Sequence, residues 1–304
     1  MSWQTTANLA WLTGRPGIKE GHPLARHTSF NIGGPAQFFL ETAEPGPVVR
    51  AAHEREVPVL VLGAGTNLLV ADAGVDGLVV RCVSREWNVD GTRVRAQAGL
   101  KMMRLARICA DQDLTGLEWA IGVPGTVGGA VYQNAGCWGT ELVEVLVEAE
   151  GLRPDGGPQA WSRDELGLGY RTSALRAGPL SGSLVTAATI DLRRGDGAAG
   201  RRQMARWTAE RNRTQPIRTK NCGSVFKNPP GDSAGRLIEM AGLKGAVEGA
   251  AQVSEQHANF IVNRGGATAA DVSTLIDRVR CAVHQRSGVT LETEVELVGR
   301  WQPQ

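Results

Sequence analysis

One glycine-rich stretch decides the fold of this chain: Gly122-Val123-Pro124-Gly125-Thr126-Val127-Gly128-Gly129-Ala130. Together with Gly136 it places five glycines within 15 positions, and Asn134-Ala135-Gly136 closes it. Pro124 stiffens its start. A globular protein keeps so many permissive residues in an apolar stretch where the backbone must approach a ligand closely. The stretch therefore predicts a loop whose backbone contacts a cofactor.

A second loop lies upstream, directly after a short apolar run: Gly63-Ala64-Gly65-Thr66-Asn67. The dinucleotide-binding fingerprint needs a glycine at position 68 and a helix after the loop, but this chain has Leu68 and a further apolar run. A P-loop is excluded because no Lys-Ser/Thr pair follows. The loop's N–H groups, with the Thr66 hydroxyl and the Asn67 amide, can bind a phosphate as a backbone nest. Taken alone, the loop fits a structural turn equally well.

Composition excludes several classes of protein. The 304 residues are 42% hydrophobic and 21% charged, as in an ordinary soluble globular protein, and the net charge of +2 does not indicate a nucleic-acid partner. No run of about 18 apolar residues exists to span a membrane. Because residues 1–23 lack the apolar core of a signal peptide, we expect a cytoplasmic protein. Five widely spaced cysteines show no metal-ligand spacing, so we expect reduced thiols and no metal.

The apolar pattern predicts an α+β architecture. Helices are expected over residues 47–56 and 101–112, and after a capping box at Thr268 and Asp271, with a stop at Gly288. Strands are expected over residues 57–62, 77–82, 94–98, 185–192, 259–263 and 291–298. In the last strand, Leu291, Thr293, Val295 and Leu297 alternate with three glutamates on the other face, Glu292, Glu294 and Glu296.

Residues 193–220 differ from their surroundings, with nine basic residues against two acidic ones. This segment is either a solvated helix between domains or a positive rim that steers a pyrophosphate towards a site, and both can hold. A nucleic-acid surface is the poorer account because Trp207 is its single aromatic residue. We therefore expect a FAD-binding domain of two α+β lobes over residues 1–195, a basic connecting segment at 196–221, and a second domain at 222–304.

A further stretch carries candidate chemistry: Gly223-Ser224-Val225-Phe226-Lys227-Asn228-Pro229. Taken with the two loops, with residues 27–36 and with Glu294, in this order, it resembles the UDP-N-acetylenolpyruvoylglucosamine reductases (UDP-N-acetylmuramate dehydrogenases). These are flavoproteins that make the muramic acid precursor of peptidoglycan and so serve cell-wall biogenesis, cell shape and cell division. The resemblance implies a FAD-binding domain of the para-cresol methylhydroxylase/vanillyl-alcohol-oxidase type, followed by a smaller α/β substrate-binding domain. It implies non-covalent FAD, held by Gly63, Ala64, Gly65, Thr66, Asn67, Gly122, Pro124, Gly125, Thr126, Gly128, Gly129 and Asn134.

The resemblance also implies the reaction. NADPH passes a hydride to FAD, and the hydride then goes to the enolpyruvyl double bond of UDP-N-acetyl-3-O-enolpyruvylglucosamine (UDP-N-acetylenolpyruvoylglucosamine), giving UDP-N-acetylmuramate. Such a reaction needs a cation beside the enolate and a proton donor. In the family these catalytic roles fall to residues that match Arg171, Ser224 and Glu294. Tyr170, Lys227 and Asn228 match substrate contacts. A monomer without nucleic-acid or membrane partners is expected.

Two departures from the family pattern are visible. Some members have a basic residue where this chain has Glu296, and some have a long insertion with a tyrosine that closes over the substrate. The interval between Arg171 and Ser224 is short, so the chain resembles the shorter, loop-less type. Two other functions stay open on the residues alone: another flavin oxidase or dehydrogenase of the same fold, and a non-catalytic flavin- or nucleotide-sugar-binding protein. Preference for NADPH over NADH is not encoded in any of these segments.

Overall fold

The computed structural model describes residues 9–301. Residues 1–8, the first part of the segment in which no signal peptide was expected, lie outside this range. The described chain divides into two compact units that interleave along the sequence. The first contains residues 9–20, 38–64 and 77–210, and the second contains residues 21–37, 65–76 and 211–301. The functional division at residues 195 and 222 remains a prediction.

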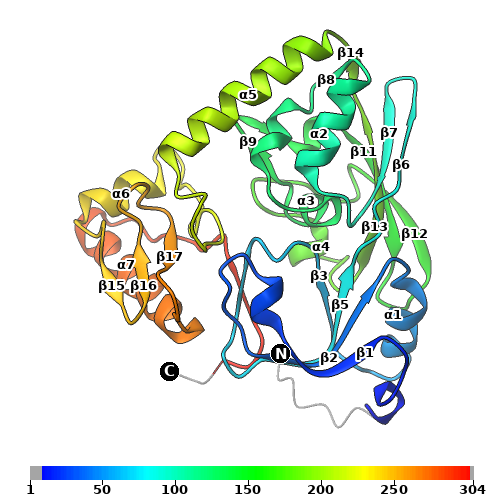
Figure 1. The fold of residues 1–304 in the computed structure, drawn as a ribbon, viewed down its shortest axis with the longest axis horizontal. Coiled ribbons are helices and arrows are strands. Elements are labelled where there is room, and N and C mark those ends of the chain that lie inside the picture. Colours follow the sequence, from blue (N-terminus) through cyan, green and yellow to red (C-terminus); the bar gives the residue numbers. More distant parts are fainter. Residues whose placement is uncertain (1–8, 302–304) are drawn as a thin grey trace. The chain divides into compact units, whose positions relative to one another are not determined.

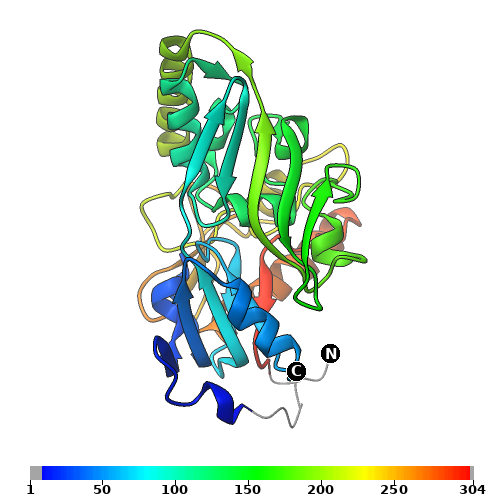
Figure 2. The same cartoon turned by 90° about the vertical axis from the view of Figure 1, so that its right-hand side faces the viewer.

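A five-stranded antiparallel sheet is the main element of the first unit (Figure 1). Its strand order is β12-β11-β13-β7-β6, with β12 at Pro158–Ser162, β11 at Leu146–Leu152, β13 at Leu184–Asp191, β7 at Arg93–Gln97 and β6 at Trp87–Asp90. Figure 2 shows the long strands of this sheet running side by side. The helices α2 (Met102–Asp111) and α3 (Val127–Gln133) belong to the same unit, and α3 packs on β13 and β7.

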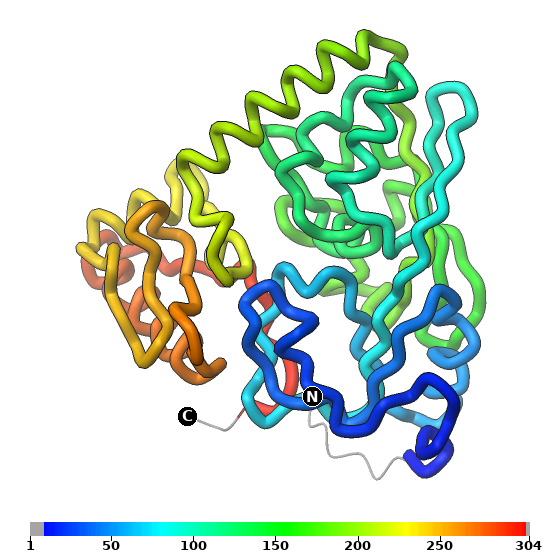
Figure 3. The backbone as a smooth tube through the Cα atoms, viewed as in Figure 1, coloured from blue at the N-terminus to red at the C-terminus, as the bar shows by residue number. Residues whose placement is uncertain are grey.

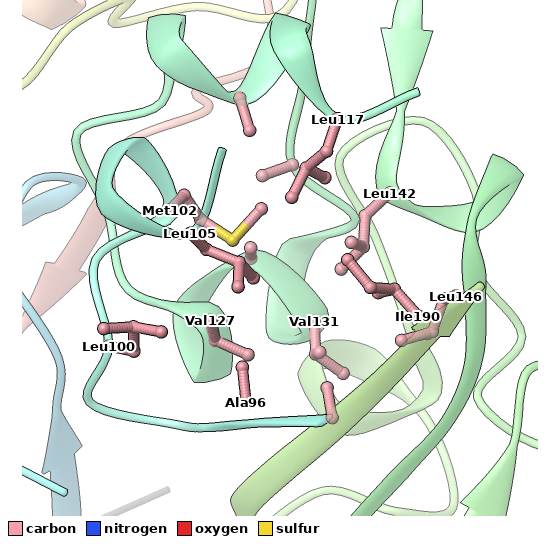
Figure 4. Packing of buried hydrophobic residues seen from close by; sticks show 14 of the residues in the cluster. Ala96, Leu100, Met102, Leu105, Leu117, Val127, Val131, Leu142, Leu146 and Ile190 are labelled. Atoms are coloured by element: carbon pink, nitrogen blue, oxygen red, sulfur yellow. The ribbon is translucent and has the colours of Figure 1, made fainter. Parts of the chain in front are cut away.

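The core of this unit lies between the sheet and these two helices. The helical spacing of Met102, Leu105, Ala106 and Cys109 places all four in the buried face of α2, as their sequence pattern predicts. In Figure 4, Val127 and Val131 of α3 point into the same cluster as Leu105 and Ile190. Burial of these apolar side chains fixes α3 on the sheet, and with it the loop that precedes α3.

A second sheet has the strand order β1-β2-β5-β3, with β1 at Ile18–Pro23, β2 at Pro35–Thr42, β5 at Val75–Cys82 and β3 at Val59–Leu62. β3 and β5 are parallel, and α1 (Gly46–His53) crosses between β2 and β3. Val49, Val57, Leu78 and Val80 form its buried cluster. The chain leaves β3 at Gly63, where the first predicted cofactor loop begins.

Short elements complete the first unit. They are the antiparallel pair β8 (Leu114–Thr115) and β14 (Arg193–Arg194), the hairpin β9 (Gly136–Cys137) and β10 (Thr140–Glu141), and the helix α4 (Ala174–Ala177). The basic segment forms the long helix α5 (Gly197–Thr214), which is exposed along most of its length. Its one aromatic residue, Trp207, stacks on Trp138 with ring centroids 5.5 Å apart.

The second unit joins segments far apart in the sequence. β15 (Val247–Glu248), β16 (Ala251–Val253) and β17 (Ile261–Asn263) form an antiparallel sheet, accompanied by α6 (Ala234–Met240) and α7 (Ala269–Ser287). A separate parallel pair joins β4 (Leu68–Val70) to β18 (Glu296–Val298). In Figure 3 the cyan trace of β4 and the red trace of β18 run together.

Most local expectations are confirmed, and two are corrected. The capping box at Thr268 and Asp271 begins α7, and Gly288 ends it with φ +72°. The glycine-rich stretch is not all loop, because residues 127–133 form α3. The last strand does not run over residues 291–298: β18 begins at Glu296, and Leu297 is 40% exposed rather than inward-facing.

Candidate active site

The loop after β3 has the donors that a phosphate needs. Within residues 9–301, no protein acceptor receives the N–H groups of Ala64, Gly65 and Thr66. Gly65 has φ +62°, and a Cβ there would lie 1.9 Å from the carbonyl oxygen of His27. Only glycine fits such a position. Consecutive unused N–H groups at a glycine turn form a nest for an anion, so these residues fit a pyrophosphate.

The two predicted cofactor loops meet inside the first unit. A Cβ on Gly63 would lie 2.7 Å from Thr126 Oγ1, so the end of β3 approaches the start of α3 closely. Thr126 caps α3 by accepting from the N–H of Gly129 at 3.4 Å. In the described chain, the N–H groups of Gly125 and Thr126 also have no protein acceptor. Inside the first unit, the start of α3 thus presents backbone donors close to the end of β3.

The glycines inside α3 have reasons of their own. The N–H of Val127 donates to the carbonyl of Leu100 at 2.8 Å, and that of Gly128 donates to the carbonyl of Ala98 at 2.9 Å. A Cβ on Gly128 would come within 2.9 Å of Ala98 Cβ. Gly128 therefore allows α3 to pack closely on the chain beside β7, whatever it contributes to cofactor binding.

Arg171 occupies a strained turn. Gly169 and Thr172 exchange two backbone hydrogen bonds of 3.1 Å, and Arg171 between them has φ +54°. A non-glycine residue in this region costs about 1–3 kcal/mol and persists only where its surroundings hold it. Arg171 Nη1 lies 3.3 Å from Glu141 Oε1, and Nη2 donates to the carbonyl of Gly136 at 3.0 Å. The guanidinium also lies over the ring of Tyr170, 4.9 Å from its centroid. Tyr170 is 46% exposed.

Asn134 and Glu141 support this turn. Asn134 is fully buried, and its amide donates to Glu141 Oε2 at 2.8 Å and to the carbonyl of Gly169 at 3.0 Å. Its Oδ1 accepts from the N–H of Val143 at 3.0 Å. These partners favour a positioning role for Asn134, while its predicted FAD contact remains a prediction. No sequence pattern indicates Glu141, which becomes recognisable only when the β9–β10 hairpin places it beside Arg171.

Ser224 and Glu294 come together in the second unit. Phe226 forms a bridge with Thr293, and the N–H of Lys227 donates to the carbonyl of Glu292 at 2.9 Å. The N–H groups of Glu294 and Val295 both donate to the carbonyl of Val225, at 2.8 and 3.3 Å. Two residues opposite one is the pairing of a β-bulge.

The bulge sets Glu294 apart from a regular strand, opposite the residue that follows Ser224. Val295 at the bulge is buried, while Leu297 lies beyond it in β18 and is exposed. Bulges often aim a side chain beside an active site.

Asn67 connects the phosphate loop to this bulge. Its Nδ2 donates to the carbonyl of Glu294 at 3.0 Å, and its carbonyl accepts from the N–H of Glu296 at 3.0 Å. The predicted cofactor residue Asn67 is thus also a support for the backbone of the predicted catalytic glutamate.

The remaining predicted substrate residues lie next to Ser224 in the sequence. Lys227 Nζ lies 3.3 Å from Glu292 Oε2, and Asn228 Oδ1 accepts from the N–H of Ala234, the first residue of α6. Both predicted substrate contacts remain predictions. Burial, and then the nearby Glu294 carboxylate, raise the pKa of the Cys222 thiol far above its ordinary value. Cys222 is therefore a neutral core residue rather than a nucleophile.

His257 also has a structural explanation. Burial is the main cause of a lowered pKa for this imidazole. Its Nδ1 accepts from the N–H of Asn259 at 3.3 Å, and its ring contacts Phe260 edge to face. The packing of the ring and its lowered pKa are those of a structural histidine.

Family models show which class of protein this chain belongs to. A FAD binding domain model matches residues 42–159, which include β3 and the loop from Gly122 to Gly129. This confirms the predicted fold class of a FAD-binding domain followed by a smaller domain. The second model, the C-terminal domain of UDP-N-acetylenolpyruvoylglucosamine reductase, matches residues 215–298. No helix in residues 9–301 is long and apolar enough to cross a membrane.

Whole-chain relatives define the family. The chain is 46% identical over 293 residues to UDP-N-acetylenolpyruvoylglucosamine reductase 2 of Symbiobacterium thermophilum, covering 94% of each chain. It is 45% identical over 289 residues to the reductase of Rubrobacter xylanophilus, covering 93% of this chain and 96% of that one. The crystal structure of the Thermus caldophilus reductase is similar with a TM-score of 0.79 and 36% identity, covering 92% of this chain and 97% of that one. This chain belongs to the UDP-N-acetylenolpyruvoylglucosamine reductase family.

Proposed function

We propose that this chain reduces UDP-N-acetyl-3-O-enolpyruvylglucosamine to UDP-N-acetylmuramate in peptidoglycan precursor synthesis, with NADPH as the hydride donor. Family membership supports the reaction. The observation that carries the assignment to this site is the pairing of the Ser224 segment with the bulge at Glu294. When bound, FAD supplies the chemistry of accepting a hydride from NADPH and delivering it to the enolpyruvyl double bond.

The backbone donors of residues 64–66 bind the FAD pyrophosphate, and residues 125–126 are further FAD contacts that family membership supports. Their N–H groups need no rearrangement, because within the described chain none of them donates to a protein acceptor. Such preorganised dipoles bind an anion without a counter-charge.

Arg171 binds the carboxylate of the enolpyruvyl group. Hydride addition to the double bond puts negative charge on the adjacent carbon, and this charge spreads into the carboxylate as an enolate. A planar guanidinium can donate two parallel hydrogen bonds to that carboxylate, and its attraction grows as the charge develops. The pairing with Glu141 and the carbonyl of Gly136 fixes the guanidinium plane before the substrate arrives.

Ser224 gives its hydroxyl proton to the carbon next to the hydride acceptor. A serine hydroxyl is a weak acid, so it serves only a strongly basic, carbanion-like centre. Glu294 lies on the segment that pairs with Val225. Its carboxyl group shares a proton with the enol form and so stabilises it. Lys227 and Asn228 donate to the substrate pyrophosphate.

Replacing Ser224 with alanine tests the proposal. NADPH should bleach the bound flavin at close to the wild-type rate, whereas reoxidation by the enolpyruvyl sugar should fall by about 10²–10⁴-fold, as for a lost general acid. Ser224→Cys, which keeps a transferable proton, should recover part of the rate. Rapid-mixing absorbance measures the two half-reactions separately. Normal reoxidation in Ser224→Ala would exclude this serine as the proton donor.

We also infer the oligomeric state of the enzyme and the cellular compartment in which it acts. It acts as a monomer, which light scattering at micromolar concentration tests. It acts in the cytoplasm, the compartment that supplies NADPH and UDP-sugars, and cell fractionation tests that location.

A further inference from the structure

Asn259 forms several hydrogen bonds with the segment after Ser224, and no sequence pattern indicates them. Its Nδ2 donates to the carbonyl of Phe226 at 2.8 Å, and its Oδ1 accepts from the N–H of Phe226 at 2.9 Å. The N–H of Val225 donates to the carbonyl of Asn259 at 2.9 Å. One residue thus provides three hydrogen bonds to the two residues directly after Ser224.

These bonds complete a two-sided arrangement. On the other side, the carbonyl of Val225 accepts from the bulge at Glu294, and Phe226 bridges to Thr293. On the Asn259 side, the side-chain amide makes the two hydrogen bonds that a neighbouring strand would make. Its donor and acceptor match those of a backbone amide, and asparagine and glutamine are the side chains that carry an amide.

Ser224 is held from both sides. Gly223, immediately before it, has φ +82°, a region that glycine adopts without strain, and its N–H donates to Asn221 Oδ1 at 2.9 Å. The residues after Ser224 are held by Asn259. Asn259 is 3% exposed, so the amide and the backbone groups that it binds have little access to water. Loss of one bond leaves a buried polar group unsatisfied, which forces the segment to move.

We propose that Asn259 is a positioning residue for Ser224: its side-chain amide holds the backbone of Phe226 so that the serine hydroxyl meets the carbon that takes the proton. This inference rests on the proposed role of Ser224. It predicts a selective loss in the second half-reaction, because the amide contacts neither of the predicted FAD loops.

Asn259→Asp is the informative variant. An ionised carboxylate still accepts from the N–H of Phe226 but cannot donate to its carbonyl, and it repels that oxygen. Reoxidation by the enolpyruvyl sugar should slow by about 10²-fold, the cost of a misplacement on the order of 1 Å. Flavin reduction by NADPH should stay close to wild type.

The same variant has a diagnostic pH dependence. Burial raises the pKa of a carboxyl group, and its protonated form has both a donor and an acceptor, like the amide. The reoxidation rate of Asn259→Asp, taken relative to wild type, should therefore rise as the pH falls from 8 to about 5.5. A general loss of stability would recover in both half-reactions together, so the diagnostic quantity is the ratio of the two half-reaction rates.

Asn263 provides a matched control. It is also a buried asparagine near β17, 7% exposed, and its amide donates to the carbonyl of Phe30 at 3.0 Å. Its Oδ1 accepts from the N–H groups of Gly265 and Ala267. Asn263→Asp should lower thermal stability similarly but leave the ratio of the two half-reaction rates unchanged.

Two measurements keep the inference separate from the role of Ser224. Amide hydrogen exchange at Val225, whose N–H donates to the carbonyl of Asn259, should accelerate in Asn259→Asp without any substrate, which tests the positioning directly. In a Ser224→Ala background, Asn259→Asp should slow reoxidation no further, because the group it positions is already gone.

The outcomes are distinct. Equal slowing of both half-reactions, additive losses in the double variant, or unchanged exchange at Val225 would each overturn the inference while leaving Ser224 as the proton donor. If Ser224→Ala itself reoxidises normally, the proposed role of Ser224 fails first, and the positioning role of Asn259 falls with it.

Discussion

Replacing Gly63 with alanine should weaken FAD binding through Thr126. The added Cβ would lie 2.7 Å from Thr126 Oγ1, below the 3.0 Å that real Cβ contacts keep. The hydroxyl must therefore move, and it then no longer caps Gly129. Loss of a threonine cap costs about 0.5–2 kcal/mol, and overpacking costs about 1–3 kcal/mol. If 1–3 kcal/mol of this cost falls on FAD binding, the Kd rises by about 5- to 150-fold.

A double-variant cycle separates this contact from a general loss of stability. In the wild-type background, Thr126→Ala removes a cap and should weaken FAD binding. In the Gly63→Ala background the same change removes the clashing atom, since Thr126 Cβ itself would lie 3.8 Å from the new methyl group. Thr126→Ala should then strengthen FAD binding. The effect of one substitution thus reverses sign with the residue at position 63.

The assay is titration of the apoprotein with FAD, followed by quenching of flavin fluorescence. Gly46→Ala, outside both predicted FAD loops, is the matched control, because its Cβ would meet Leu152 Cδ1 at an ordinary 3.5 Å. That variant should bind FAD normally. Wild-type affinity in Gly63→Ala, or additive effects in the cycle, would refute the contact between the two loops as a determinant of FAD binding.

Three further predictions concern other parts of the chain. Arg171→Lys keeps the charge but loses the planar fork, so it should slow substrate reduction more than flavin reduction by NADPH; equal slowing in stopped-flow traces would remove the assignment. Glu141→Gln leaves Arg171 without its ionic partner at 3.3 Å and should slow the same half-reaction by up to about tenfold, or ~1.4 kcal/mol, with the FAD Kd unchanged. Asp72 accepts from the N–H groups of Ala269 and Ala270 at 2.8 and 3.0 Å, so Asp72→Asn should lower the free energy of unfolding by about 0.5–2 kcal/mol in urea titrations. An unchanged urea midpoint would show that α7 does not depend on this cap.

Local sequence was sufficient where local chemistry decides the structure. The capping box at Thr268 and Asp271, the stop at Gly288 and the apolar face of α2 follow from helix ends and spacing, and all three are present. The glycine loops were recognisable because few backbones other than ligand-binding ones need so many glycines.

Tertiary contacts decided the rest. Residues 127–133 are helical despite two glycines, because packing of Val127 and Val131 outweighs weak helix propensity. The bulge at Glu294 depends on a carbonyl at Val225, about 70 positions earlier, which no pattern within the last strand contains. The alternation rule also failed at Leu297, which lies in β18 and is 40% exposed. Arg171 with positive φ was likewise invisible, since glycine, not arginine, marks such positions in a sequence.

The parallel pairing of β4 with β18 has a consequence for synthesis on the ribosome. Leu68 pairs with Glu296, so 227 residues must be translated between the two partners. At about 5–20 residues per second, β4 waits on the order of 10–50 s for its neighbour. Throughout that interval the bond from the N–H of Ala71 to the carbonyl of Val298 is also unmade. The first unit can fold during translation, whereas the second unit, with the loop that supports Glu294, closes only after the last strand has left the ribosome.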